Sequence, residues 1–366
     1  MCVVPSLASV FENVFTITCV VHQALCNRES GESEKKSTNR RVRAVEMMSL
    51  RPTSLSSRLA SRCLHLCQKR QYLFDRTSFL CLYYLLSGKD YKKILTMADQ
   101  PQQIYKTLQD LLPVKSNPSL STSVIPSLLQ SIQKVAETLR SSQTISQAGT
   151  ANAFGYDQLN VDVQAENVIR EALAACPAVV TASSEEDPKE VSTTSDAVPN
   201  DSGEEYTVAF DPLDGSSIIA PNWTVGTIIG IWEGSSALNQ SPAKKQIASI
   251  LGVFGPRTTA IVAWRLHGIS VCFEIGLSST SCEIVRPDVK FTSPPFKTRY
   301  FAPANLRAAA EDERYSALIS KYISEKYTLR YSGGLVPDVV HALVKGHGVY
   351  VSPVTEASKA KLRRLY

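Results

Sequence analysis

The sequence predicts a layered α/β protein over residues 97–366, in which helices cover the faces of a sheet. Several segments place apolar residues at helical spacing, and short β-branched runs lie between them. Stretches rich in Ser, Asp, Gly and Pro separate these segments, as expected for surface connections. Mixed helices and strands of these lengths are typical of a layered body.

The first part of this region is predicted to be mainly helical. Residues 102–112 form a short predicted helix, and residues 113–123 a loop that contains Pro118. A clearer helix begins near Pro126. Its apolar positions recur every three or four residues, at Leu128, Leu129, Ile132, Val135, Ala136 and Leu139. Residues 147–155 are a predicted loop of small residues. A second amphipathic helix then carries Val161, Ala165, Val168, Ile169 and Ala172 and ends before Pro177.

The second part is predicted to be mainly strands. We expect strands at 178–182, 206–210, 224–232, 258–264, 269–275, 328–331 and 348–353. We expect helices at 243–251, 308–326 and 337–344. Residues 187–204 are polar and predict a surface excursion between two strands.

The net charge of +5 is unevenly distributed. Residues 1–96 carry 15 Lys and Arg against 7 Asp and Glu, whereas residues 97–366 carry 24 against 27. The basic excess therefore belongs to the N-terminal extension, and the body shows no nucleic-acid footprint. We expect this extension to be poorly ordered, with an over-long gene model that truly begins at Met97 as the favoured interpretation. Residues 47–74, rich in Arg and Ser and free of acids, leave an organelle transit peptide as the alternative.

Cysteine usage indicates a reducing, cytoplasmic compartment. Six of the nine cysteines lie before residue 97, so the body does not depend on a disulfide framework. Cys63, His65 and Cys67 could suggest zinc, but no second ligand pair follows them. No apolar run approaches the roughly 20 residues that a membrane-spanning helix needs, so no membrane partner is expected.

The stretch from Asp211 to Ser217, Asp-Pro-Leu-Asp-Gly-Ser-Ser, carries the most chemical information. It follows the apolar run 206–210, so a strand delivers two carboxylates at its end. Carboxylate and carbonyl oxygens suit Mg²⁺. The successive N–H groups of the Gly-Ser-Ser turn can hold an anion. The combination predicts metal-assisted hydrolysis of a phosphate ester.

Six carboxylates are candidates for one site, because they lie at the ends of strands or at the start of a helix. They are Asp157, Asp162, Glu185, Glu186, Asp211 and Asp214. Such ends can converge at one edge of a sheet, and divalent cations would offset the repulsion between the acids. Taken alone, residues 185–187 are more often a solvated acidic turn, and Asp162 is more often a helix cap.

Several motifs resemble the class 1 fructose-1,6-bisphosphatase family, and most closely its sedoheptulose-1,7-bisphosphatase branch. The run Val-Ala-Phe-Asp-Pro-Leu-Asp-Gly-Ser-Ser at 208–217 and the run Val-Gly-Thr-Ile-Ile-Gly-Ile-Trp at 225–232 carry the likeness. Further stretches agree in order and spacing, at 154–162, 252–259, 305–307, 327–338 and 359–363. The likeness covers about residues 125–366 and implies a layered α-β-α-β-α sugar-phosphatase fold that acts on a sugar bisphosphate with two or more Mg²⁺ per site.

The resemblance also implies a role for each matching residue. Glu185, Asp211 and Asp214 match metal-binding carboxylates, with the carbonyl of Leu213 as a further ligand. Glu186 and Asp162 match the acids that position and deprotonate the attacking water. The residues that match substrate-binding positions are Gly215, Ser216 and Ser217 for the 1-phosphate, and Asn305, Arg330, Tyr331 and Lys361 for the sugar and its distal phosphate. Without the motif, Arg330 and Lys361 would be read as surface charges.

The resemblance leaves two functions open. The first is Mg²⁺-dependent hydrolysis of the 1-phosphate of sedoheptulose-1,7-bisphosphate or fructose-1,6-bisphosphate by a homo-oligomeric enzyme of carbohydrate metabolism. The family continues after the position of Tyr366 with a metal-binding glutamate, so we expect the domain at 97–366 to lack its C-terminal end and the last layer to be incomplete. The alternative is therefore a catalytically impaired relic that binds sugar phosphate or pairs with an intact paralogue. An inositol-monophosphatase-like activity would not explain Arg330, Tyr331 and Lys361.

Overall fold

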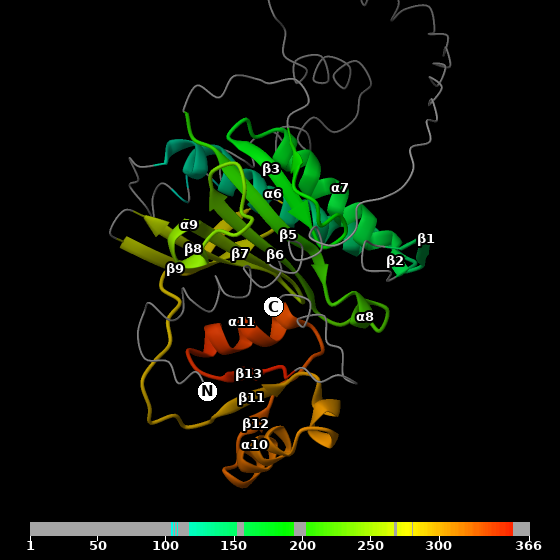
Figure 1. Cartoon of the computed structure of the whole chain (residues 1–366), viewed down its shortest axis with the longest axis vertical. Helices are drawn as coiled ribbons and strands as arrows, with labels where there is room; N and C mark the ends of the chain where they lie inside the picture. Colours follow the sequence, from blue (N-terminus) through cyan, green and yellow to red (C-terminus); the bar gives the residue numbers. More distant parts are fainter. Residues whose placement is uncertain are drawn as a thin grey trace, which may run out of the picture. The chain divides into compact units, whose positions relative to one another are not determined.

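The computed structural model describes residues 104, 106, 108, 117–151, 157–193, 203–266, 269–279 and 281–353 of the chain (Figure 1). All of them belong to one compact unit. The expectations for residues 1–96, for the zinc alternative at Cys63 to Cys67 and for Lys361 lie outside the described residues. Residues 104, 106 and 108 are helical, in agreement with the helix predicted at 102–112.

A large sheet forms the centre of the described structure. Its eight strands follow the order β10-β9-β8-β7-β6-β5-β3-β4. The strands are β3 (Val179–Ser184), β4 (Val191–Ser192), β5 (Tyr206–Asp214), β6 (Val225–Glu233), β7 (Gln246–Phe254), β8 (Thr258–Leu266), β9 (Ile269–Leu277) and β10 (Cys282–Arg286). Strands β3 and β5 pair in parallel, whereas the other neighbours in this sheet are antiparallel. This one parallel pair brings the carboxyl ends of β3 and β5 to the same edge.

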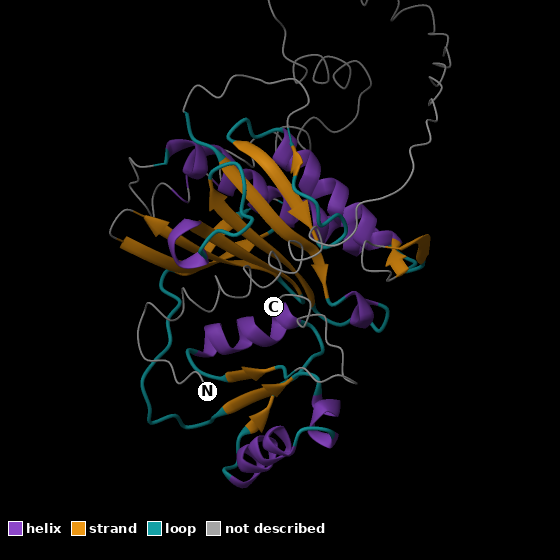
Figure 2. Ribbon diagram, viewed as in Figure 1, coloured by secondary structure: helices purple, strands orange, loops and turns teal. Residues whose placement is uncertain are grey.

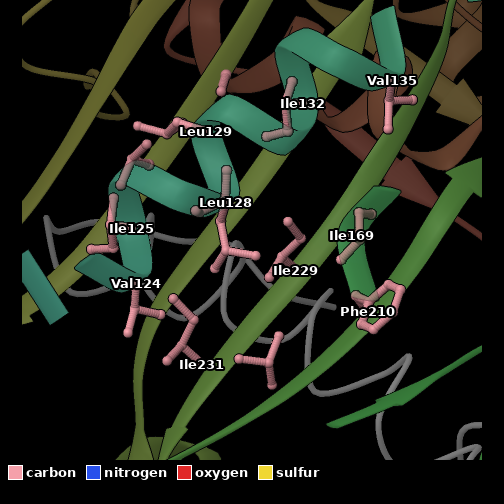
Figure 3. Packing of buried hydrophobic residues seen from close by; sticks show 14 of the residues in the cluster. Val124, Ile125, Leu128, Leu129, Ile132, Val135, Ile169, Phe210, Ile229 and Ile231 are labelled. Atoms are coloured by element: carbon pink, nitrogen blue, oxygen red, sulfur yellow. The ribbon is translucent and has the colours of Figure 1, made fainter. Parts of the chain in front are cut away.

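Two long helices cover one face of this sheet. The π-helical turn η1 (Leu120–Val124) leads into α6 (Ile125–Ser141), and α7 (Asn160–Ala174) lies beside α6. Pro126 stands in the first turn of α6, where its missing N–H costs no hydrogen bond. Fully buried apolar side chains of α6 and α7 meet those of β5 and β6 in the main core (Figure 3). The helical spacing in the sequence identified this buried face correctly.

Helix α11 (Leu335–Lys345) lies against the opposite face of the large sheet, where it contacts β6 and β7. A second core joins Ile228 and Leu251 of the sheet to Val336 and Val339 of the helix. Beyond α11 lies a parallel three-stranded sheet in the order β12-β11-β13, formed by β12 (Thr328–Leu329), β11 (Tyr300–Pro303) and β13 (Val349–Val351).

The 3₁₀ turn η2 (Leu306–Ala310) and helix α10 (Glu313–Ser324) follow β11, and Tyr322 of α10 packs on Phe301 of the small sheet. The layers therefore run α6 and α7, large sheet, α11, small sheet, α10 (Figures 1 and 2). This succession confirms the predicted α-β-α-β-α architecture.

Four short elements complete the described structure. They are β1 (Gln147–Ala151) and β2 (Asp157–Leu159), which pair with each other, and the four-residue helices α8 (Ser216–Ile219) and α9 (Pro242–Lys245). Within the described residues, no helix combines the length and the apolar character needed to cross a bilayer.

The helix predicted at 243–251 is wrong. Helix α9 ends at Lys245, and the chain continues as β7 from Gln246 to Phe254, paired on both sides with β6 and β8. Most residues of β7 are buried, because helices cover both faces of the sheet. A strand buried on both faces loses the polar alternation that distinguishes it from a helix in the sequence.

The single helix predicted at 308–326 is also wrong, because the chain breaks at Asp312. The carboxylate of Asp312 accepts hydrogen bonds from the N–H groups of Arg314 at 2.9 Å and Tyr315 at 3.3 Å, which makes it the N-cap of α10. The loops predicted at 113–123 and 147–155 are wrong in part. The chain is helical from Pro118, and β1 occupies residues 147–151.

The close approach of α11 to the large sheet requires glycine at position 226. A Cβ atom added to Gly226 would lie 2.5 Å from the Cβ atom of Val336 and 2.7 Å from the carbonyl oxygen of Gly252. We expect Gly226→Ala to lower the free energy of unfolding by about 3 kcal/mol or more, because neither neighbour is the flexible end of a side chain. Urea unfolding followed by circular dichroism measures this.

Gly234→Ala is the matched control, since Gly234 directly follows the same strand. An added Cβ there meets nothing within 4 Å, and only its φ of +100° opposes a side chain. We expect a loss of about 1 kcal/mol from that backbone conformation. Equal losses in the two variants would show that helix α11 does not pack tightly at Gly226.

Candidate functional site

The acids at the ends of β3 and β5 lie at one edge of the large sheet. Ser184 pairs with Phe210 in the parallel register, and the N–H of Glu185 donates to the carbonyl of Phe210 at 3.0 Å. Glu185 and Glu186 therefore leave β3 beside the point where Asp211 continues β5. The convergence expected for these two segments is present in the backbone.

Helix α7 brings Asp162 to the same group of acids. The carboxyl of Glu186 is electrostatically coupled to Glu185, Asp162 and Glu166. Burial and, to a smaller extent, the three neighbouring carboxylates raise the pKa of Glu186 to about 7, although a hydrogen bond from Gln158 lowers it. A cation among these groups would offset their repulsion.

Asp162 also caps helix α7, which is the structural role that its sequence position favours. It is buried in the first turn of α7, and its Oδ2 atom accepts a hydrogen bond from the N–H of Leu159 at 3.0 Å. The side chain therefore caps the helix while it lies near Glu186. The two roles are compatible, because one carboxylate has a second oxygen.

The turn from Asp211 to Gly215 is fixed by local hydrogen bonds. Asp211 is buried, and its Oδ1 atom accepts from the N–H of Leu213 at 3.0 Å. The hydroxyl of Thr227 donates to the carbonyl of Pro212 at 2.9 Å. The pairing of β5 with β6 becomes irregular between Asp211 and Asp214, and such irregularities redirect side chains at the ends of strands. Gly215 then adopts a φ of +94°, which favours glycine, and Ser216 begins α8.

Asp214 connects this turn to the second half of the fold. Its Oδ2 atom accepts a hydrogen bond from the N–H of Val336 at 2.8 Å, in the first turn of α11. Burial raises the pKa of Tyr350 in β13, and the nearby carboxylates of Asp214 and Asp338 and the phenol of Tyr331 raise it further. Asp214 and Tyr331 therefore lie around the same half-buried tyrosine.

Two of the predicted substrate residues, Asn305 and Tyr331, lie together. Burial and the nearby carboxylate of Asp338 raise the pKa of Tyr331, and a hydrogen bond with the backbone of Asn305 lowers it. Asn305 itself has a φ of +50°, and its amide nitrogen donates to the carbonyl of Pro353 at 2.8 Å. The guanidinium of Arg330 is exposed and lies 5.7 Å from the ring centre of Tyr300.

A cavity of about 570 Å³ lies between the large sheet and α11. Arg330 and Tyr331 line it, together with the buried carboxylates of Asp338 and Glu274. The described lining contains none of the acids predicted to bind metal. Arg330 and Tyr331 are therefore the predicted residues found at its wall.

The acidic edge fits Mg²⁺ in the kind of donor it offers, since its groups are hard oxygens with excess negative charge. Across the described ranges, however, no three His, Cys, Asp or Glu side chains converge closely enough to hold an ion as they stand. Internal hydrogen bonds account for part of this, because Asp211 and Asp214 each direct an oxygen to a backbone N–H.

The sequence did not reveal the groups that form hydrogen bonds with the acids or with the residues beside them. They are Gln158, Glu166, Arg170, Ser184 and the N–H of Val336. Their signal was present, because positions 162, 166 and 170 share one face of α7 and Ser184 directly precedes the acidic pair. The four side chains are common polar types and the fifth group is a backbone N–H, so their supporting role is visible only from their contacts in the structure.

Comparison with family models decides the relationship. Residues 110–277 match the N-terminal domain of fructose-1-6-bisphosphatase, and residues 295–366 match the C-terminal domain. The chain belongs to the fructose-1,6-bisphosphatase family. Both halves of the fold, on either side of the contact between Asp214 and α11, fall within these matches.

Relatives from both branches of the family are similar to this chain. It is 39% identical over 245 residues to a chloroplastic sedoheptulose-1,7-bisphosphatase of Chlamydomonas reinhardtii, which covers 66% of this chain and 59% of the relative. It is 35% identical over 228 residues to a class 1 fructose-1,6-bisphosphatase of Syntrophotalea carbinolica, which covers 60% and 64%. The chain thus spans less than two thirds of the length of these curated relatives.

Solved structures agree on the fold. A crystal structure from Toxoplasma gondii, described as a sedoheptulose-1,7 bisphosphatase, matches with a TM-score of 0.59 at 33% identity, over 70% of this chain and 80% of the other. The holo fructose-1,6-bisphosphatase of Leishmania major matches with a TM-score of 0.53 at 20% identity, over 65% and 75%. The second likeness supports the layered architecture alone.

Variants of Asp214 can distinguish its hydrogen bond to the Val336 N–H from its predicted role as a metal ligand. In EDTA, we expect Asp214→Ala to lower the free energy of unfolding by about 1 kcal/mol, because α11 loses an acceptor for its first turn. Asp214→Asn keeps an amide oxygen and should lose less than half of that. We expect Mg²⁺ to raise the melting temperature of the unchanged chain and to leave that of both variants as it is. An Asn variant as unstable in EDTA as the Ala variant would contradict the capping role.

Proposed function

We propose that this chain hydrolyses the 1-phosphate of a ketose bisphosphate with the help of Mg²⁺. The observation that carries the proposal is the parallel pairing of β3 with β5, which places residues 185–186 beside residue 211 at one sheet edge. Carboxyl ends of strands in α/β sheets are the usual place for a ligand. The relatives in both branches carry names of sugar bisphosphatases.

The acids divide into two proposed roles. Glu185, Asp211 and Asp214, with the carbonyl of Leu213, would hold Mg²⁺. Bound Mg²⁺ would polarise the phosphoryl group and neutralise the charge on the leaving oxygen. Glu186 and Asp162 would orient the attacking water and accept its proton. Glu186 suits this second role, because a carboxyl whose pKa lies near 7 can take up a proton at neutral pH.

The turn after β5 would hold the scissile phosphate. Gly215, Ser216 and Ser217 follow the acids directly, so the N–H groups of this turn and the metal ligands come from one short segment. Distances between the phosphate and the acids would then be set by the backbone rather than by flexible side chains. Such preorganisation lowers the cost of reaching the transition state.

The distal part of the substrate would lie toward the small sheet. Asn305, Arg330 and Tyr331 would bind the sugar and its second phosphate, and Lys361, outside the described residues, is proposed to join them. Guanidinium, ammonium and phenol donors suit a phosphate dianion. A second phosphate explains these donors, which a monophosphate would not require. Sedoheptulose-1,7-bisphosphate is the first candidate, and fructose-1,6-bisphosphate the second.

Asp211→Asn tests the proposed chemistry. We expect the full 366-residue chain to release phosphate from both bisphosphates only with Mg²⁺ present, and the variant to retain less than about 1% of that rate, because a neutral amide is a poor ligand for a hard cation. Phosphate release with each bisphosphate and with inositol monophosphate, with and without EDTA, is the measurement.

Asp288→Asn is the control, because Asp288 is an exposed acid between β10 and β11 with no proposed role. It should keep most of the activity. Faster release from the monophosphate than from either bisphosphate would contradict the substrate class. An unchanged chain that binds a bisphosphate without turnover would support the binding-only alternative.

Arg330→Met tests the grip on the second phosphate. Loss of a charge-assisted hydrogen bond should raise KM for the bisphosphate about tenfold or more and leave kcat nearly unchanged, because the donor acts far from the reacting bond. Lys321→Met, an exposed cation on α10, should leave KM as it is. Equal KM values for the two variants would show that Arg330 does not bind the second phosphate.

A further inference from the structure

A buried polar network lies behind the acidic turn that follows β3. It consists of Glu166 and Arg170 on α7, Ser184 at the end of β3, and Asp187 after the acids. Glu166 and Ser184 are buried, whereas Arg170 and Asp187 are partly or largely exposed. None of these four residues belongs to the metal or phosphate set proposed above.

Ser184 is the junction of this network. Its hydroxyl donates to Oε1 of Glu166 at 2.8 Å and accepts from the N–H of Asp187 at 3.0 Å. The N–H of Ser184 in turn donates to the carbonyl of Asp187 at 2.9 Å. Residues 184 and 187 are thus joined twice, once through the backbone and once through the serine hydroxyl. The two residues enclosed by these bonds are Glu185 and Glu186.

Glu166 and Arg170 hold the serine hydroxyl in place. The Oε1 atom of Glu166 accepts from Ser184 and also from Nε of Arg170, with which it forms an ion pair one helical turn away. The guanidinium lies 5.6 Å from the ring centre of Phe210 on β5, and its Nη2 atom donates to the Ser184 hydroxyl at 3.3 Å. The network therefore ties the acidic turn to α7 and to β5 together.

This network can hold the acidic turn closed against the repulsion between its carboxylates. Glu185 and Glu186 are adjacent carboxylates that repel one another, and Asp162 and Glu166 add to the repulsion. Without fixed bonds on both sides, the turn would open and separate its charges. Bonds that close it at residues 184 and 187 hold residues 185 and 186 beside the end of β5. Outer partners of this kind commonly set metal affinity.

We propose that Ser184, held by Glu166 and Arg170, is a positioning residue that fixes Glu185 and Glu186 in the arrangement needed to bind a divalent cation. This inference depends on the proposed function for its consequence in catalysis. It assigns roles to Ser184, Glu166 and Arg170 that the sequence motifs did not suggest.

The neighbouring residue offers a matched control. Ser183 is as fully buried as Ser184, but within the described structure its hydroxyl has no hydrogen-bond partner. Ser183→Ala and Ser184→Ala remove the same atom from adjacent positions of one strand. A purely structural effect on β3 would appear in both variants, whereas an effect through the turn would appear only at Ser184.

The experiment measures Mn²⁺ binding to the full chain by isothermal titration calorimetry, without substrate, and the melting temperature in EDTA. We expect Ser184→Ala to weaken Mn²⁺ binding about tenfold or more and Ser183→Ala to leave it within about twofold of the unchanged chain. Equal affinities in the two variants, or an unchanged chain that binds no Mn²⁺, would overturn the inference.

Two further variants keep the test decisive if Ser184→Ala fails to fold. Glu166→Gln keeps an oxygen acceptor for Ser184 but loses the ion pair with Arg170, and Arg170→Met removes that pair from the other side. Each should weaken Mn²⁺ binding about threefold or more and lower kcat for the bisphosphate with little change in KM. Mn²⁺ affinities equal to that of the unchanged chain in both would overturn the inference.

Failure of the proposed function has a different signature. If the unchanged chain binds Mn²⁺ in a manner that depends on Ser184 and yet releases no phosphate from any bisphosphate, the positioning role stands and the proposed reaction is wrong. If phosphate is released and the Ser184→Ala and Ser183→Ala variants behave alike in Mn²⁺ binding and in kcat, the reaction stands and the positioning role is wrong.

Discussion

The parallel pairing of β3 with β5 is the constraint on which the candidate site depends. Within the described large sheet the other neighbouring strands pair antiparallel, so the carboxyl ends of two neighbours lie at opposite edges of the sheet. Only a parallel pair brings two carboxyl ends to one edge. The bond from the Glu185 N–H to the Phe210 carbonyl extends that pairing one residue past the end of β3. A shift of one residue in this register would turn the acids of one strand to the other face.

Helix α11 also fixes the turn that follows β5, through a hydrogen bond to Asp214. It approaches the large sheet closely over Gly226, buries Val336 and Val339 against Ile228 and Leu251, and offers the N–H of Val336 to Asp214. The position of Asp214 therefore depends on how α11 packs in the second core. The contact also brings the turn after β5 near the small sheet, because Asp214 and Tyr331 both lie near Tyr350.

Local patterns in the sequence predicted the layered α/β body and the acidic segments, whereas the order of the layers was implied by the family resemblance. Helical spacing identified the buried face of α6, and the run before Asp211 identified β5. Prediction failed where the pattern is ambiguous. The segment from Gln246 is buried on both faces and reads equally well as a helix, and the break at Asp312 depends on one capping side chain. The supports at Glu166, Arg170 and Ser184 depend on contacts between distant segments, which no local pattern records.

The acidic edge also has a cost that the rest of the fold must offset. Burial and neighbouring carboxylates raise the pKa of Glu186 from its usual value to about 7. A folded-state pKa above the unfolded value means that the native chain binds the extra proton, so this group stabilises the fold at low pH. That contribution is lost as the pH rises from about 4.5 toward 7. At neutral pH the burial of this carboxyl and its repulsion by neighbouring acids thus oppose folding, and the proposed cation would relieve the repulsion. The proposed cation would gain part of its binding energy by relieving this repulsion. The closure at Ser184 and Asp187 would keep the turn from separating its charges before the ion binds.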